Sequence, residues 1–378
     1  MHLLLVWRLL SLAVDAGTYR SNLPLDHPAI DYRHQAASNR VESLGGSVPQ
    51  TLAALLSALE ISPDSQTLVF SKTSFVARQV SPKTPRAIYF NDDTYLAWTQ
   101  PAAIEIATVD ARLGMAFYTV REGKLERQTQ CLSCHQTAAT MGVPGVFVGS
   151  VLPNANGVPA HGEQSIITSP DTPFRDRWGG WYVDRVPDKF EDRSNSWAID
   201  PSDTTQLTKM LSPVYEASRY LRPGSDPIAL LTLEHQTTAT NLLTRLAWED
   251  AMANPDPRTL REVIAVLSYA GERRLPQPLA APSAFRAQFE IAGLRSFDLR
   301  EKVFRYPLSY LLASGVFLRL RSPLRHEIYE KISTSEAPGL GDALDILQRT
   351  SEDFRLWREN QIENGVASTQ AGRADRNQ

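Results

Sequence analysis

The chain has 378 residues, of which 42% are hydrophobic and 21% charged, a composition typical of a globular protein whose core needs no disulfide or structural metal. Thirty-nine Lys and Arg against 42 Asp and Glu leave a formal charge of −3, which argues against a protein held on nucleic acid by bulk positive charge. Only two cysteines occur, so a disulfide scaffold is excluded.

The N-terminal residues 1–16 are mostly apolar, but the run is too short to span a bilayer and Arg8 interrupts it. With Val14 and Ala16 as small residues near its end, the segment is similar to a secretory signal whose charged first part is weak. An ordinary apolar helix or a misassigned start explains it equally well. No later run reaches the length of a transmembrane helix, so we expect no transmembrane span.

The first half of the chain is rich in strand patterns. Residues 51–61 have leucines at helical spacing, and short apolar runs separated by turn residues follow. Two pairs of runs flank turn residues, at 91–93 and 110–114, and each pair predicts a hairpin. Residues 124–130, by contrast, are polar and helical in character. The predicted strands are 68–70, 86–90, 94–98, 104–109, 115–120 and 146–152.

The second half of the chain is helical in pattern. It follows a polar, aromatic-bearing stretch, 160–205, with little periodicity. Asp226 and Pro227 predict the cap and first residue of a helix that runs to about Ala253. Further helices are predicted at 258–271, 283–293, 307–319, 322–333, 341–348 and 350–357. Strands first and helices after predict an α+β fold rather than alternating βαβ units.

This order divides the chain into four segments. Residues 1–16 are the weak signal segment, and 17–204 form a strand-rich α+β region. Residues 205–358 form a helical region that packs on it, and 359–378 a polar, disordered tail.

Both cysteines belong to one short motif, Cys131-Leu-Ser-Cys134-His135, which lies in the α+β region. Random placement would put two cysteines three apart with a His directly after them about once in ten thousand sequences of this composition. The motif is therefore the strongest functional signal in the chain.

Three other uses of paired cysteines compete. A thioredoxin-type dithiol expects a buried strand before the motif and a helix from it, whereas residues 124–130 are polar and helical in character. A structural zinc site needs four ligands, and no pair of histidines has the spacing to complete one. A disulfide between cysteines three apart is strained and of little structural value. The dithiol is the alternative that stays open.

In Cys131, Cys134 and His135 the chain resembles the c-type cytochromes. The resemblance implies one covalent haem, joined by thioether bonds to both cysteines, with His135 as the proximal iron ligand. It also implies maturation outside the cytoplasm, so the protein is expected to be periplasmic or otherwise extracytoplasmic. It covers a few dozen residues and names a cofactor rather than an activity.

The second axial iron ligand is sought among the remaining His and Met residues. His235 is the first choice, because it lies in the helix that begins at Pro227 and the helical spacing points it inward. His161, in a loop, is the second choice. Met210 lies within reach, whereas Met141 is too close to the motif. The other candidates are Met115, Met252, His27, His34 and His326.

Several further polar and aromatic residues are candidates for lining the site. Residues 71–74 and 91–93 bracket a strand pair and line either a pocket or, in the commoner case, turns. Arg175 and Arg177 are candidates for pairing with haem propionates. Trp178, Trp181 and Tyr182 are candidates for packing on the porphyrin edge, although such aromatics usually belong to the core.

The sequence thus predicts a c-type cytochrome domain protein that takes part in electron transfer. The alternative is a single-haem redox enzyme with a substrate pocket over the iron, since about 100 residues suffice for haem electron transfer. A haem-based ligand sensor is a third, weaker reading. The expected partner is a redox protein or a small-molecule substrate, and not a nucleic acid.

Overall fold

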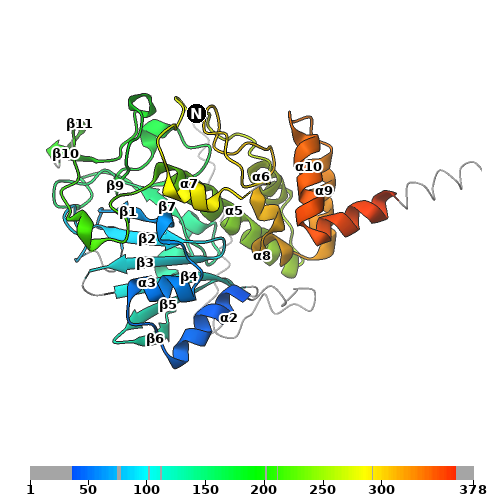
Figure 1. Ribbon diagram of the computed structural model, residues 1–378, viewed down its shortest axis with the longest axis horizontal. Coiled ribbons are helices and arrows are strands. Elements are labelled where there is room, and N and C mark those ends of the chain that lie inside the picture. The colour runs from blue at the N-terminus through cyan, green and yellow to red at the C-terminus, as the bar shows by residue number, and fades with distance from the viewer. Residues whose placement is uncertain are drawn as a thin grey trace, which may run out of the picture.

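The computed structural model describes residues 36–74, 78–100, 103–110, 113–200, 202–210, 212–291 and 293–362. The described strands all lie before residue 210 and the long helices after residue 226, as Figure 1 shows, so the predicted α+β class is confirmed. The predicted start of the helical region at 205 is wrong, because residues 205–209 belong to the strand β11 Asp203–Lys209. The predicted signal segment and residues 363–378 of the predicted tail lie outside the described residues. Residues 359–362 of that tail are helical, so the predicted start of disorder at 359 is wrong.

A seven-stranded antiparallel sheet forms the centre of the first half, in the order β6-β5-β4-β3-β2-β1-β9. Both predicted hairpins are confirmed, with Phe90 opposite Tyr95 and Asp110 opposite Gly114 at their turns. Two smaller antiparallel pairs, β7 with β8 and β10 with β11, lie apart from this sheet. The strands are β1 Thr67–Val69, β2 Arg86–Phe90, β3 Thr94–Thr99, β4 Ala103–Asp110, β5 Gly114–Arg121, β6 Lys124–Arg127, β7 Val148–Ser150, β8 Ile166–Thr168, β9 Trp181–Tyr182, β10 Ser196–Asp200 and β11 Asp203–Lys209.

Most described helices follow the predicted positions, but those over 36–43 and 132–135 were not predicted, the predicted helix 283–293 ends at Phe289, and the predicted helix 307–319 is divided. The predicted helix 307–319 is a 3₁₀ turn, η8 Tyr310–Ala313, followed by α8. Ser314 separates them because its backbone is extended and its side chain caps the new helix at the Phe317 N–H. The helices are α2 Ala36–Ser43, α3 Leu52–Ala58, α4 Leu132–His135, α5 Pro227–Ala251, α6 Pro257–Leu267, α7 Ala284–Phe289, α8 Gly315–Leu318, α9 Ser322–Ser333, α10 Leu340–Thr350 and a last helix over 352–362.

Both faces of the sheet are largely buried, so most of its strand residues are apolar, whereas the edge strand β6 is polar and partly exposed. One face packs under α2 and α3, where Leu96 and Ile106 meet Leu55 and Leu56. The other face belongs to the larger core that includes α5. Because successive side chains of a strand point to opposite faces, Leu96 belongs to the first core and its neighbour Tyr95 to the second.

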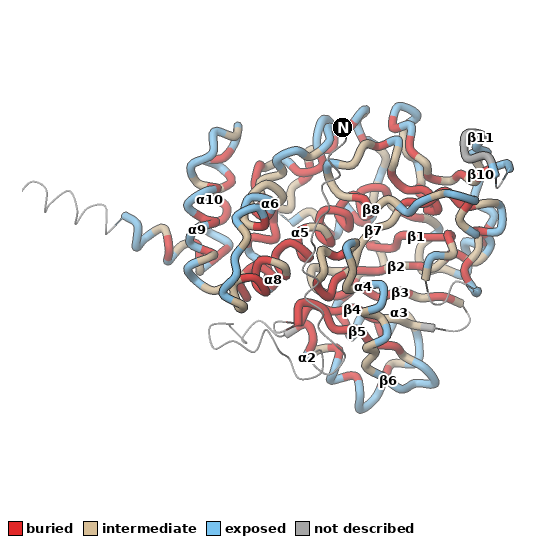
Figure 2. The backbone as a smooth tube through the Cα atoms, turned by 180° about the vertical axis from the view of Figure 1, so that it is seen from behind, coloured by how far each residue is buried: buried red, intermediate tan, exposed pale blue. Residues whose placement is uncertain are grey.

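The helix α5 is the most deeply buried element. Its predicted start is confirmed: the Asp226 side chain accepts from the backbone N–H of Ile228 at 2.8 Å, and Pro227 is the first helical residue. Nearly all of its 25 residues are buried, because the sheet lies on one side and the other helices on the other (Figures 1 and 2). Among the described residues, no helix combines the length and the hydropathy needed to cross a membrane.

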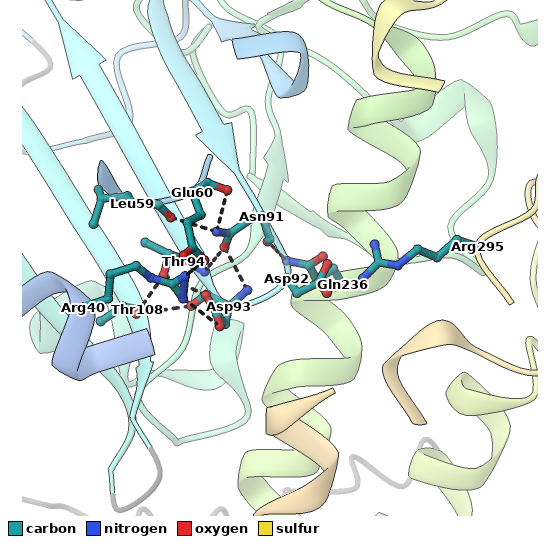
Figure 3. Close-up of polar contacts among 10 residues, drawn as sticks. All are labelled: Arg40, Leu59, Glu60, Asn91, Asp92, Asp93, Thr94, Thr108, Gln236 and Arg295. Atoms are coloured by element: carbon teal, nitrogen blue, oxygen red, sulfur yellow. Dashed lines mark hydrogen bonds and ion pairs between the residues drawn. The ribbon is translucent and has the colours of Figure 1, made fainter. Parts of the chain in front are cut away.

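The β2–β3 turn connects these layers (Figure 3). Asn91 makes the turn, since its Oδ1 accepts from the backbone N–H groups of Asp93 and Thr94 at 3.2 and 2.9 Å. Its Nδ2 donates to the last carbonyls of the α3 segment, Leu59 at 3.0 Å and Glu60 at 3.2 Å. Residues 91–93 are therefore a structural turn, the commoner of the two readings that the sequence allows.

The same turn also contacts both helical layers. Arg40 of α2 pairs with Asp93 at 3.5 Å, and burial raises the pKa of the Asp93 carboxyl. On the opposite side Gln236 of α5 donates to the Asn91 carbonyl at 2.6 Å, and Arg295 pairs with Asp92. The turn is therefore a junction between the sheet, α2, the end of α3 and α5.

Replacing Asn91 tests this junction. Asn91→Ala removes two turn bonds and two bonds to the α3 segment, so we expect a loss of about 2–3 kcal/mol in the free energy of unfolding, measured by urea denaturation. Asn154→Ala is the matched control, because Asn154 caps its own turn in the same way at Asn156 and Val158. The control is expected to lose about 1 kcal/mol. Equal losses of stability in the two variants would contradict the role of Asn91 as a junction between the sheet and the α3 segment.

Candidate functional site

The Cys131–His135 segment forms a single helical turn. α4 spans Leu132–His135, and the backbone N–H of His135 donates to the Cys131 carbonyl at 2.9 Å. Residues three and four apart lie on the same side of a helix. The side chains of Cys131, Cys134 and His135 therefore face the same way, and all three line one cavity.

This cavity has a volume of about 440 Å³, within the roughly 300–1,000 Å³ typical of ligand and cofactor pockets. Its floor is the face of the sheet that also packs against α5. Its walls come from α4, from residues 146–151 around β7, from Leu233 and Thr237 of α5, and from Ile167. α4 itself is only partly covered (Figure 2). The floor residues are mainly apolar and include Val69, Ile88, Ala97, Ala107, Phe117 and Trp181.

The His135 ring is fixed in orientation. It lies against two aromatic rings, with centroid distances of 5.1 Å to Phe117 and 5.5 Å to Phe147. Its Nδ1 is 2.9 Å from the Gly145 carbonyl, which can only accept, so Nδ1 carries the proton. Burial lowers the pKa of His135, so the ring is neutral at pH 7 and its Nε2 has a free lone pair. This is the arrangement of a histidine metal ligand oriented by a carbonyl.

The Gly145 carbonyl is held in place from both sides. The Gly145 N–H donates back to the His135 carbonyl at 2.9 Å. On its other side lies α5, and a Cβ at this position would come within 2.1 Å of the Asn241 Oδ1 atom. A larger residue here would have to displace the buried Asn241 side chain, which α5 places against this backbone. Asn241 also donates to the Val146 carbonyl at 2.9 Å, which holds the segment after Gly145.

The two thiols have different environments. Both cysteines are free, with Cys134 exposed and Cys131 half-buried. Burial raises the pKa of the Cys131 thiol to about 11, and the nearby Glu105 carboxylate adds to the rise. A reactive dithiol requires the opposite, a lowered thiol pKa.

The segment before the motif differs from the prediction. Residues 124–130 were expected to be helical, but Lys124–Arg127 is the edge strand β6, paired with β5 from Tyr118 to Arg121. The alternation of exposed and half-buried residues in β6 fits a strand at the edge of a sheet. The absence of a preceding strand is therefore no argument against a dithiol. The strand is nevertheless an antiparallel edge and not the buried strand of a βαβ unit.

A charged pair lies on the floor of the cavity. Arg86 Nη2 donates to Glu105 Oε2 at 2.5 Å. The two residues come from β2 and β4, with β3 between them, and Ala97 lies directly opposite Glu105. The small Ala97 side chain lets Arg86 and Glu105 meet above β3. Thr73 and Ser74 also line the cavity, so this part of the 71–74 segment does border a pocket.

His235 lies elsewhere, and the structure does not bring it to the cavity. It is buried as the helical spacing predicted, but its Nε2 is 2.8 Å from the Ser309 Oγ, and its ring packs on Tyr269 at 4.8 Å. Leu233 and Thr237, which do line the cavity, are on the other side of α5. The inward direction of His235 therefore leads into the helical layer, and its expected role as distal iron ligand is not retained.

The other axial candidates are also placed away from the described lining. Met210 accepts from the Tyr182 hydroxyl at 3.7 Å, next to the core under α2 and α3. Met115 is in the main core, Met141 in the turn after α4, Met252 at the end of α5, and His326 in α9. His161 is exposed. His27 and His34 lie outside the described residues.

Of the predicted porphyrin neighbours, only Trp181 lines the cavity. Arg175 is 75% exposed. Arg177 is buried, and each of its three nitrogens donates to a protein oxygen, with Glu234 as its ion-pair partner at 2.8 Å. The expected pairing of Arg177 with haem propionates is therefore wrong. Trp178 also donates to Glu234, and Tyr182 donates to the Pro82 carbonyl.

The sequence reasoning did not identify the residues that complete the site. Phe117, Phe147, Gly145, Arg86 and Glu105 carry no motif. Gly145 follows Pro144 ten residues after His135, a turn signal that marks where the chain returns to the motif. The other four depend on strand register and chain path, which no local pattern gives.

Comparisons of the chain with known protein families, with curated proteins and with solved structures found no match. Within the described ranges, no three His, Cys, Asp or Glu side chains lie close enough together to hold a metal ion. The site is therefore interpreted from its own geometry.

The structural role of His235 predicts a pH dependence. Burial lowers the pKa of His235 to about 3, against about 6.5 in the unfolded chain, so the unfolded chain binds more protons between these values. Stability due to the neutral ring is present above pH 6.5 and lost as the pH falls toward 3. Between pH 7.5 and 5.0 this residue is expected to remove about 2 kcal/mol from the free energy of unfolding.

The measurement is urea denaturation at both pH values for the original protein, for His235→Gln and for the exposed control His161→Gln. His235→Gln is expected to lose about 2 kcal/mol less on acidification, while His161→Gln behaves like the original protein. The same acid loss in all three proteins would contradict the neutral, buried state of His235.

Proposed function

We propose that the chain is a single-haem protein of the c-type cytochrome class that takes part in electron transfer, with haem c as its cofactor. Cys131 and Cys134 would hold the haem by thioether bonds, and His135 would bind its iron. The observation that carries the proposal is that the three motif side chains line one largely apolar cavity, with the His135 Nε2 lone pair free.

The donor set fits this cofactor. The Gly145 carbonyl keeps the proton of the neutral His135 ring on Nδ1. The Nε2 atom is therefore unprotonated and can bind the iron without first losing a proton. The low pKa of the buried ring means that binding does not compete with a proton at neutral pH. Phe117 and Phe147 both pack against the His135 ring and limit its rotation.

The apolar floor fits a porphyrin as well. Side chains such as Val69, Ile88 and Ala107 exclude water from a flat, hydrophobic ligand. When bound, haem supplies an iron centre that exchanges one electron, with a potential set by its axial ligands and its exposure. The chain's own residues contribute attachment, one axial nitrogen and a low-polarity enclosure.

Electron transfer is favoured by the position of the motif at the surface. Cys134 and Ser133 are exposed, whereas the sheet beneath them is buried. A cofactor attached through Cys134 has one edge close to solvent, where a redox partner protein reaches it. Covalent attachment of haem implies a periplasmic or otherwise extracytoplasmic location, as expected from the motif.

The dithiol alternative is disfavoured by the thiols themselves. The pKa of Cys131 is raised to about 11 by burial, so at pH 7 the thiol is protonated and a poor nucleophile. A raised pKa does not oppose thioether formation, after which the sulfur no longer titrates.

A single-haem redox enzyme, or a haem-based ligand sensor, is the second candidate. The observation that favours it is the Arg86–Glu105 pair inside the cavity, since a purely apolar pocket is enough to hold a porphyrin. A charged pair next to a redox centre suits the handling of a polar substrate or small ligand.

The haem attachment is tested by replacing both cysteines. The full chain, expressed with the cytochrome c maturation machinery, is expected to stain for haem peroxidase activity on a denaturing gel, because covalent haem survives denaturation. Cys131→Ala with Cys134→Ala is expected to remove the stain completely. Ser133→Ala, a change of an exposed residue between the two cysteines, is the control and should keep the stain. Stain persisting in the double variant would refute the attachment.

Visible spectra separate the two functions. A low-spin spectrum in both oxidation states that carbon monoxide and cyanide leave unchanged supports electron transfer. A high-spin spectrum that shifts on adding either ligand supports the enzyme or sensor instead.

A further inference from the structure

The charged side chains in the described lining of the cavity are Arg86 and Glu105. Both are largely enclosed, with side chains 19% and 22% exposed. Their charges act on the motif, since both Arg86 and Glu105 contribute to the shifted pKa values of Cys131 and His135. The pair therefore lies within electrostatic reach of both residues.

Not all N–H donors of the Arg86 guanidinium have partners within the protein. Its Nη2 is used by Glu105, but its Nε is buried and has no hydrogen-bond partner. The Ser74 Oγ, in the same cavity lining, is likewise buried without a partner. The Arg86 side chain lines the cavity and is 19% exposed, so its guanidinium can meet a ligand that supplies acceptors.

The type of ligand follows from the donors. A guanidinium binds planar or anionic oxygen and nitrogen acceptors most strongly, and a hydroxyl donor beside it favours the same groups. Glu105 fixes the guanidinium on the sheet and balances its charge, so the cavity stays neutral until a ligand enters. The sequence placed anion pairing at Arg175 and Arg177, but the first is exposed and the second is used by Glu234.

We propose that Arg86, held by Glu105, is the anion-binding group of this cavity. The inference rests on the proposed haem function and assigns the anion beside the haem to this residue. The anion is either a propionate carboxylate of the haem itself or a small exogenous anion of the type represented by azide. Both would accept from the Arg86 guanidinium, which lines the cavity.

The two members of the pair should act with opposite signs. Arg86→Gln removes the donor and the positive charge, so it weakens anion binding. Glu105→Gln removes the competing carboxylate and leaves Arg86 uncompensated, so it strengthens anion binding. An ion pair that only stabilises the sheet would instead make both variants alike. Arg274→Gln is the control, because Arg274 pairs with Glu301 at the surface, with side chains 82% and 69% exposed.

The experiment uses full-length protein that carries covalent haem by the gel stain. Azide is titrated at pH 7 by the shift of the main haem absorption band, and the midpoint potential is measured as a function of pH. For an exogenous anion, we expect azide to bind about tenfold or more weakly in Arg86→Gln and more tightly in Glu105→Gln. For a propionate, azide binding is unchanged, and the pH at which the potential titrates rises in Arg86→Gln and falls in Glu105→Gln.

Either pattern supports the assignment and identifies the source of the anion. Stained protein in which both variants shift the same way, or in which neither quantity changes, overturns it while the haem function stands. Loss of the stain in the original protein overturns both. Should Arg86→Gln not fold, Arg86→Met, which keeps the aliphatic part and removes both the charge and the donors, carries the same comparison with Glu105→Gln.

Discussion

The structure depends on one helix, α5, that is buried on all sides. Its backbone groups are satisfied within the helix, but its polar side chains must find partners inside the protein. Glu234 does so with Arg177 at 2.8 Å and Trp178 at 3.2 Å. Gln236 does so with the Asn91 carbonyl on the sheet and with the Tyr310 hydroxyl at 2.9 Å in the helical layer. Loss of one partner of such a buried ion pair typically costs about 3–5 kcal/mol, so these contacts fix the position of α5 relative to the sheet and the helical layer.

The fixed position of α5 also fixes the geometry of the candidate site. Because α5 cannot shift, Asn241 comes within reach of the Val146 carbonyl and presses against Gly145. Gly145 in turn orients His135 through its carbonyl. A chain of three contacts thus leads from the most buried element to a half-exposed turn of helix. The orientation of the iron-ligand candidate is set from the core and not by α4, which is a single turn and cannot hold a side chain on its own.

What the sequence predicts well is what local chemistry decides. Asp226 and Pro227 mark the start of α5, turn residues mark both hairpins, and the three motif residues Cys131, Cys134 and His135 line one cavity. Prediction fails where the answer depends on distant segments. Helical spacing showed that His235 points inward, but α5 has protein on every side, so an inward residue faces either the cavity or the helical layer. Likewise Lys124–Arg127 is polar with no strand signal of its own, and it is a strand because β5 offers an open edge.

The same helix explains the length of the chain. About 100 residues suffice for haem electron transfer, so the much greater length of this chain suggests at first a catalytic function in addition to the proposed electron transfer. Yet a helix with apolar side chains on all its faces needs protein on all its faces. The sheet covers one side of α5, and α6 to α8 with η8 cover the other. Much of the second half of the chain is therefore accounted for as the support of α5, which contributes just two described residues to the cavity, Leu233 and Thr237. The case for an activity beyond the proposed electron transfer thus rests on the charged pair inside the cavity, not on the size of the protein around it.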